Sequence, residues 1–188
     1  MGVLISFLRG VNMIGHNKIK MADLSSLFRE IGYHDAETYI QSGNVVFTAG
    51  NRLSPGKISY NIGRVIREKF GYEIPVLLRT GKDMEKIIKG NPYREREDFD
   101  ASRLAVVFLS EFPGEEQLAR FRDVSYLPDE FRIAGKEIYI YCPNGFGRTK
   151  LHTNFFENRL KITCTARNWQ TVNRLFEMAV KKIRHQDQ

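Results

Sequence analysis

Residues 38–48 read TYIQSGNVVFT, and this stretch decides the fold that the sequence predicts. β-Branched and aromatic side chains recur in residues 38–41 and 45–48, which favours two short strands. Residues 42–44 between them read SGN, and glycine and asparagine tolerate the positive φ of a tight turn. We therefore expect a β-hairpin at this place.

A helix and then a strand flank this hairpin on each side. Before it, residues 3–9 form an apolar run expected as a strand buried on both faces, and residues 21–31 repeat apolar side chains at helical spacing. After it, Ser54 and Pro55 suit the cap and first position of a second helix, and residues 74–78 form another strand. The resulting order is that of a ferredoxin-like unit.

The same order recurs in the second half of the chain. Strands are expected at 104–109, 131–134, 137–141 and 161–165, and helices at 114–122, 149–160 and 168–183. Gly135 and Lys136 form the turn of a second hairpin. The predicted fold class is α+β, a tandem of two ferredoxin-like β-α-β-β-α-β units with extra helices, one of them at 82–89.

A charged segment with a proline, NPYREREDFD at 91–100, predicts the connection between the halves. The predicted organisation is a first half at 1–90, a linker at 91–102, and a second half at 103–188 that includes the C-terminal helix. Each half is small, so both would gain stability by burying surface together.

Composition excludes several classes of protein. No apolar run in the 188 residues approaches the roughly 18 needed to span a membrane, and residues 3–9 make a poor signal peptide. We expect a cytoplasmic protein without a membrane partner. Two cysteines and four histidines without metal-ligand spacing predict no zinc site, no disulfide framework and no cofactor.

Positive charge concentrates near the C-terminus. Residues 145–185 contain nine basic and two acidic side chains, a difference that equals the formal net charge of +7 of the whole chain. A localised basic patch suggests an anionic partner, although a merely solvated basic surface gives the same pattern.

Two loops are candidate anion sites. Residues 10–20 connect a strand to a helix and, with Arg9, supply Asn12 and Lys18 beside a helix N-terminus, where N–H groups and a partial positive charge favour phosphate. Residues 145–150 read GFGRTK and supply Arg148 and Lys150. Thr149 is expected to cap the following helix, and the spacing is not that of a Walker loop.

A third candidate is Arg167, which precedes the final helix. A guanidinium there can meet a carboxylate or phosphate in bidentate fashion. Asn168 is expected to cap the helix, and Trp169 lies on its apolar stripe, which favours a core position.

Three segments carry a resemblance to a known family. They are FLRGVNMIGHNKIKMADL at 7–24 with TYIQSGNVVF at 38–47, then PNGFGRTKL at 143–151, and TARNWQTV at 165–172. In this order they resemble the bacterial family catalogued as domain of unknown function 1697. The resemblance implies a small cytoplasmic protein with a doubled ferredoxin-like architecture and no established activity. The first loop departs from the family's small, glycine-rich pattern, since residues 13–16 read MIGH.

The leading hypothesis is a binding protein for a phosphate-bearing ligand, either a nucleotide or nucleic acid. Its proposed contacts are Arg9, Asn12, Lys18, Arg148, Lys150 and Arg167, gathered around one place. One alternative is an enzyme acting on a small anionic substrate in a cleft between the halves. Another is a structural or interaction protein that pairs through a sheet edge.

Overall fold

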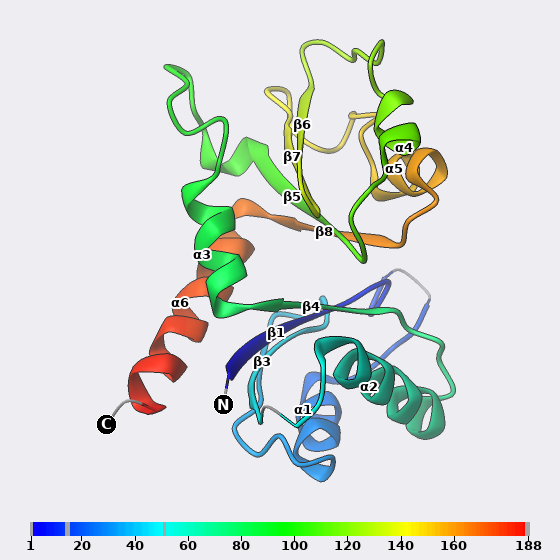
Figure 1. The fold of residues 1–188 in the computed structure, drawn as a ribbon, viewed down its shortest axis with the longest axis vertical. Helices are drawn as coiled ribbons and strands as arrows, with labels where there is room; N and C mark the ends of the chain where they lie inside the picture. Colours follow the sequence, from blue (N-terminus) through cyan, green and yellow to red (C-terminus); the bar gives the residue numbers. More distant parts are fainter. Residues whose placement is uncertain (1, 14–15, 51, 187–188) are drawn as a thin grey trace. The chain divides into compact units, whose positions relative to one another are not determined.

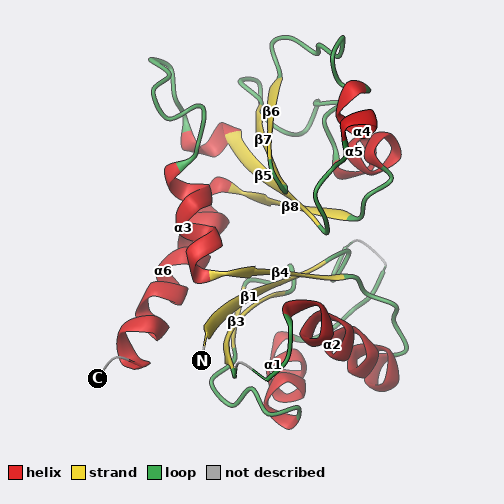
Figure 2. Cartoon of the chain, viewed as in Figure 1, coloured by secondary structure: helices red, strands yellow, loops and turns green. Residues whose placement is uncertain are grey.

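The computed structural model describes residues 2–13, 16–50 and 52–186, with the side chain of residue 186 excepted. It contains two four-stranded antiparallel sheets (Figure 1, Figure 2). The chain forms two compact units, one of residues 1–85 and 174–188 and the other of residues 86–173.

The first unit is built on the sheet order β2-β3-β1-β4. Its strands are β1 (Gly2–Leu8), β2 (Glu37–Tyr39), β3 (Asn44–Ala49) and β4 (Val76–Thr80). Helices α1 (Met21–Glu30) and α2 (Pro55–Phe70) pack their apolar stripes against one face of this sheet. From Val3 to Leu8 every residue of β1 is buried, as its apolar sequence predicts.

The predicted hairpin is present, but its turn differs from the prediction. Residues 40–43 form the turn, and positive φ falls on Ile40 (48°) and Gly43 (72°), not on Asn44. Asn44 is fully buried in β3, where its amide nitrogen donates to Tyr39 O at 3.1 Å and to Ser42 Oγ at 2.8 Å. Through these hydrogen bonds the Asn44 side chain stabilises the turn, while its backbone belongs to strand β3.

The second unit repeats this topology, with the sheet order β6-β7-β5-β8. Its strands are β5 (Leu104–Leu109), β6 (Glu130–Ala134), β7 (Glu137–Tyr141) and β8 (Cys164–Asn168). The remaining elements are α3 (Gly81–Lys89), the 3-10 turn η1 (Ala101–Arg103), α4 (Glu115–Ala119), α5 (Thr153–Leu160) and α6 (Trp169–Gln186). The tandem of two ferredoxin-like units is therefore confirmed.

Two predicted boundaries near the end of the second unit are shifted. Helix α5 starts at Thr153, because Thr149 does not cap it: the Thr149 hydroxyl accepts from Leu151 N at 3.1 Å in the preceding loop. Strand β8 starts three residues later than expected, after Lys161 has ended α5 in a left-handed conformation. Asn168 caps α6 as predicted, accepting from Thr171 N at 2.8 Å.

The segment predicted as a linker at 91–102 packs within the second unit. Tyr93 is buried and stacks on Tyr141 of β7, with ring centroids 5.4 Å apart. The Arg96 guanidinium lies 4.8 Å from the centroid of the Tyr141 ring, and Tyr141 Oη donates to Asp98 O at 2.9 Å. Composition alone predicts a connection here because most of these side chains are charged. The aromatic side chains of the segment nevertheless stack on β7 and hold it in the second unit.

The C-terminal part of α6, which the sequence assigns to the second half, belongs to the first unit. Lys182 is buried there, and its ammonium donates to the Asp35 carbonyl and to Glu37 Oε1, the latter at 2.7 Å. An ion pair with Asp35 Oδ2 at 3.4 Å completes the contact. Lys182 thereby fastens the end of α6 to the segment that leads into β2.

Gly43 offers a test of this packing. A Cβ there would lie 2.8 Å from Leu8 Cβ, and φ is +72°. Gly43→Ala should destabilise the protein by about 3 kcal/mol, because backbone strain adds to a clash with a core side chain. Gly71→Ala, at φ +76° but with nothing within 4 Å, is the matched control and should cost about 1 kcal/mol. Urea unfolding measures the free energy of unfolding of both variants. Equal losses in the two would contradict the close approach of Gly43 to Leu8.

Asp35 gives the fold a defined acid sensitivity. Partial burial pushes its pKa upward, but hydrogen bonds from Thr48 and attraction to Lys182 hold the pKa below the ordinary 3.8. A depressed folded-state pKa contributes stability that is fully present above the unfolded value and is lost as pH falls through the folded value. Asp35→Asn should therefore lower the urea midpoint at pH 7, and this deficit should shrink below about pH 3.8. A deficit that persists unchanged to pH 2, or an equal one in the exposed control Glu111→Gln, would contradict this role.

Candidate functional site

The register of β7 with its two neighbours places three strand ends together. Tyr141, the last residue of β7, pairs with Leu104 at the start of β5 and with Glu130 at the start of β6. The chain that enters β5, the chain that enters β6 and the chain that leaves β7 therefore meet at one end of the second sheet.

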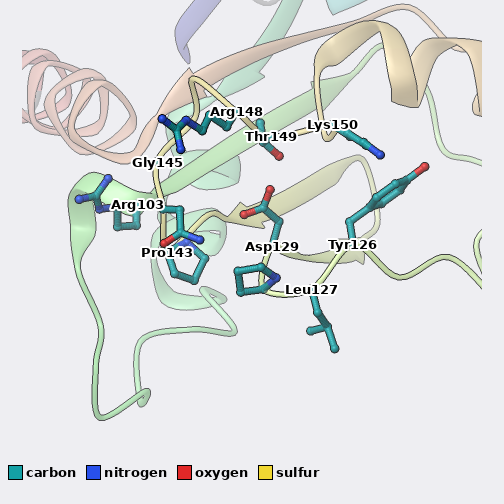
Figure 3. A pocket seen from close by; sticks show the side chains of 11 residues that line it. Arg103, Tyr126, Leu127, Asp129, Pro143, Gly145, Arg148, Thr149 and Lys150 are labelled. Carbon is teal, nitrogen blue, oxygen red and sulfur yellow. The ribbon is translucent and has the colours of Figure 1, made fainter.

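A pocket of about 620 Å³ lies at this end of the sheet. It is lined by Arg103 and by residues 126–129, 143–145 and 148–150, all from the second unit (Figure 3). Its volume falls within the range of small-molecule sites in proteins. The pocket thus has the size for a compact ligand.

Cations outnumber acids on its wall. Of the described residues that line the pocket, Arg103, Arg148 and Lys150 are basic and Asp129 is the one acid. In the view of Figure 3 the two guanidinium groups lie toward one side, Lys150 and Tyr126 toward the other, and Asp129 between them. The pocket is therefore suited to an anion that also carries a hydrogen-bond donor.

Arg103 is held at the wall by backbone geometry. Its carbonyl accepts from Cys142 N at 2.9 Å, and its Nη1 would lie 2.7 Å from a Cβ on Gly145, where φ is +84°. Glycine at this position suits the positive φ of the loop, and its missing Cβ leaves room for the guanidinium. Arg103 Nε also pairs with Asp100 Oδ2 at 3.4 Å, and hydrogen bonds from Ser102 hold the pKa of Asp100 below its usual range.

The opposite side of the pocket is aromatic. The Lys150 ammonium lies 5.9 Å from the centroid of the Tyr126 ring. That ring in turn packs edge-on against Phe155 of α5, with centroids 5.4 Å apart and planes at 86°. The core of the unit thus fixes the orientation of Tyr126, which remains partly exposed toward the pocket.

Cys142 directly precedes the lining residues 143–145, and its side chain is fully buried. Burial raises the pKa of its thiol to about 11, while a hydrogen bond with Thr149 lowers it and one with Asp129 raises it. A fully buried, protonated thiol has little reactivity near neutral pH.

The sequence-predicted candidates of the first unit lie in the loop before α1. Arg9 is half-buried and Lys18 is exposed, whereas Asn12 is used inside the loop. Its amide nitrogen donates to Ile19 O and Gln41 O, both at 2.8 Å, and its oxygen accepts from Ile19 N at 2.9 Å. Asn12 therefore shapes the loop and joins it to the β2–β3 turn. Of the residues in which this loop departs from the family pattern, Ile14 and Gly15 lie outside the described residues.

Arg167, the third candidate, does not line the pocket. It lies on β8, opposite Val106, and is only 8% exposed. Its Nη1 donates to Thr165 Oγ1 at 2.8 Å and to Ala166 O at 2.7 Å, and burial lowers its pKa to about 10. Arg79 has the equivalent place on β4, is also buried, and donates to Leu78 O at 2.9 Å. The paired positions indicate a structural role shared by the two units.

Two charged residues of the pocket are not predicted as site residues from the sequence. Arg103 directly follows the segment predicted as a linker at 91–102, and Asp129 falls in a stretch where no strand or helix is expected. The signal that locates them is the strand register, since each immediately precedes a strand that pairs with β7. Within the described ranges, no group of three or more His, Cys, Asp or Glu side chains could hold a metal ion. No helix among them is sufficiently long and hydrophobic for a membrane crossing.

Topology and pocket together define an α+β protein of two tandem ferredoxin-like units, the second of which carries a basic pocket at one end of its sheet. The chain belongs to the family described as protein of unknown function, DUF1697, whose model matches residues 1–139. Among solved structures, it is similar to the conserved bacterial protein SP0830 from Streptococcus pneumoniae, with 21% identity and a TM-score of 0.75 over 95% of this chain and 98% of that one. This likeness concerns the fold. No curated protein matches the chain significantly.

Proposed function

We propose that the protein binds a phosphate-bearing ligand in the pocket at the end of the second sheet. The observation that carries this proposal is the convergence of Arg103, Arg148 and Lys150 from two segments far apart in sequence on one pocket of about 620 Å³. Two of these three residues, Arg148 and Lys150, are also the cations that the sequence pattern singles out.

The chemistry of the three side chains supports phosphate over other anions. A guanidinium presents planar N–H donors that match two oxygens of a phosphate, and an ammonium adds a point charge with three donors. Arg148 and Lys150 are exposed, so a ligand can reach them. Placing three cations around one concavity concentrates positive potential there, which attracts multiply charged anions.

We propose fewer binding residues than the sequence-based hypothesis names. Asn12 and Arg167 donate to acceptors within their own units, so they are left out of the proposed binding residues. Cys142 is also left out of the proposed binding residues, because its thiol is buried and its pKa is raised. A cytoplasmic location belongs to the proposal and is supported by the low cysteine content, two buried residues in the chain, which suits a reducing compartment.

Removal of one guanidinium tests the binding site. Pyrophosphate is the probe, since it carries the charge of the ligand class without any organic part. Arg148→Gln should weaken its binding by about tenfold, because a charge-assisted hydrogen bond is worth roughly 1.5–3 kcal/mol. Binding should also weaken as salt rises from 50 to 200 mM, and titration calorimetry measures both effects.

The matched control is Arg122→Gln, which removes an exposed arginine of the same unit that does not line the pocket. It should leave pyrophosphate affinity unchanged. Equal affinity in Arg148→Gln and the unmodified protein, or equal loss in the two variants, would show that the pocket is not the site.

A further inference from the structure

We infer that the pocket recognises a mononucleotide, with its phosphate at the two arginines, its ribose at Asp129 and its base on Tyr126. This inference rests on the proposed function and specifies its ligand class. Three features of the pocket wall support the inference. The two arginines lie apart from Tyr126, Asp129 is a hydrogen-bond acceptor among cations, and the Tyr126 ring has a fixed orientation.

The phosphate end follows from the paired guanidinium groups. Arg103 Nη1 lies beside Gly145, 2.7 Å from the place that a Cβ would take, and the same loop continues to Arg148. Asp100 pairs with Arg103 through Nε, at 3.4 Å, which orients the guanidinium while its Nη1 faces the loop. Two forked donors facing one concavity suit a terminal phosphate with several oxygens.

Asp129 restricts what can be attached to that phosphate. A carboxylate disfavours a second anionic group nearby and accepts hydrogen bonds from hydroxyl or amino donors. The vicinal hydroxyls of a ribose fulfil this requirement, and acidic side chains recognise ribose in other nucleotide sites for the same physical reason. The backbone holds Asp129 in place beside Tyr126, because its N–H donates to Tyr126 O at 3.0 Å.

Tyr126 supplies a surface for a flat ring. Phe155 contacts it edge-on at 5.4 Å, which fixes the plane of the ring without covering both of its faces. Base stacking on such a ring contributes about 1–3 kcal/mol and does not depend on which base is present. The neighbouring Lys150 ammonium adds a charge within reach of the same wall.

The size of the pocket favours a mononucleotide over nucleic acid. A volume of about 620 Å³ suits a ligand of one base, one sugar and one or two phosphates. Continuous nucleic acid needs a groove that follows its backbone, with successive aromatic platforms. Of the pocket's lining residues, Tyr126 is the one aromatic.

The test compares inorganic phosphate, ribose 5-phosphate, AMP and adenosine by titration calorimetry on the full chain. Affinity should rise at least about tenfold from phosphate to ribose 5-phosphate and again to AMP, and adenosine should bind more weakly than AMP by about 100-fold. AMP binding no tighter than phosphate would overturn the inference while leaving the proposed function intact. No binding by any phosphate-containing probe would overturn both. Tighter binding of a ten-nucleotide single strand than of AMP would replace the mononucleotide with nucleic acid.

Variants of Asp129 and Tyr126 test which side chain binds the ribose and which binds the base. Asp129→Asn should weaken ribose 5-phosphate and AMP about tenfold and leave inorganic phosphate unchanged or slightly tighter, because it removes a negative charge. Tyr126→Leu should weaken AMP alone, and Tyr126→Phe, which keeps the ring and its contact with Phe155, should retain AMP affinity. A uniform loss for all probes in Asp129→Asn, or loss of AMP affinity in Tyr126→Phe, would contradict the assignment.

Discussion

The antiparallel register around Tyr141 is the constraint on which the candidate site depends. Tyr141 pairs with Leu104 and Glu130, so the segments before β5 and β6 must lie beside the loop that leaves β7. The packing of Tyr141 reinforces this register, because Tyr93 and Phe99 stack on its ring and its hydroxyl donates to the Asp98 carbonyl. The charged segment that sequence reasoning treats as a linker thus holds Arg103 at the wall of the pocket.

The two units share a topology but use equivalent corners of their sheets differently. In the first unit, the segment entering β2 carries Asp35, which binds the hydroxyl and amide of Thr48 near the end of β3. There the acid meets an ammonium of the protein itself, Lys182. In the second unit, the segment entering β6 carries Asp129, which faces a pocket with three cations on its wall. In the first unit the acid forms an internal ion pair, whereas in the second unit it lines a basic pocket.

Much of the fold follows from local sequence, because each half alternates apolar periodicities with clear turn signals. Ser54 caps α2 and Asn168 caps α6, as their positions in the sequence predict. The hairpin turn starts at Ile40 and not at Ser42 as predicted, since nothing in the residue type of Ile40 favours its positive φ. The place of the end of α6 in the first unit does not follow from local sequence, because a long-range contact such as that of Lys182 with Glu37 leaves no local signal.

The candidate site was predictable only in part for a similar reason. Arg148 and Lys150 stand out beside two glycines, whereas Arg103 and Asp129 become members of the site only through strand pairing. Burial was also invisible at Arg167, whose charge suggests a ligand contact but whose guanidinium donates to Thr165 and Ala166 within β8.

The central claim, that phosphate groups bind among these three strand ends, is tested most directly by mapping backbone amide shifts in a ¹H–¹⁵N NMR titration with pyrophosphate. We expect saturable shifts at residues 143–150, Arg103 and Asp129, with little change along α2. Shifts confined to other segments, or a weak drift across the whole surface without saturation, would contradict it.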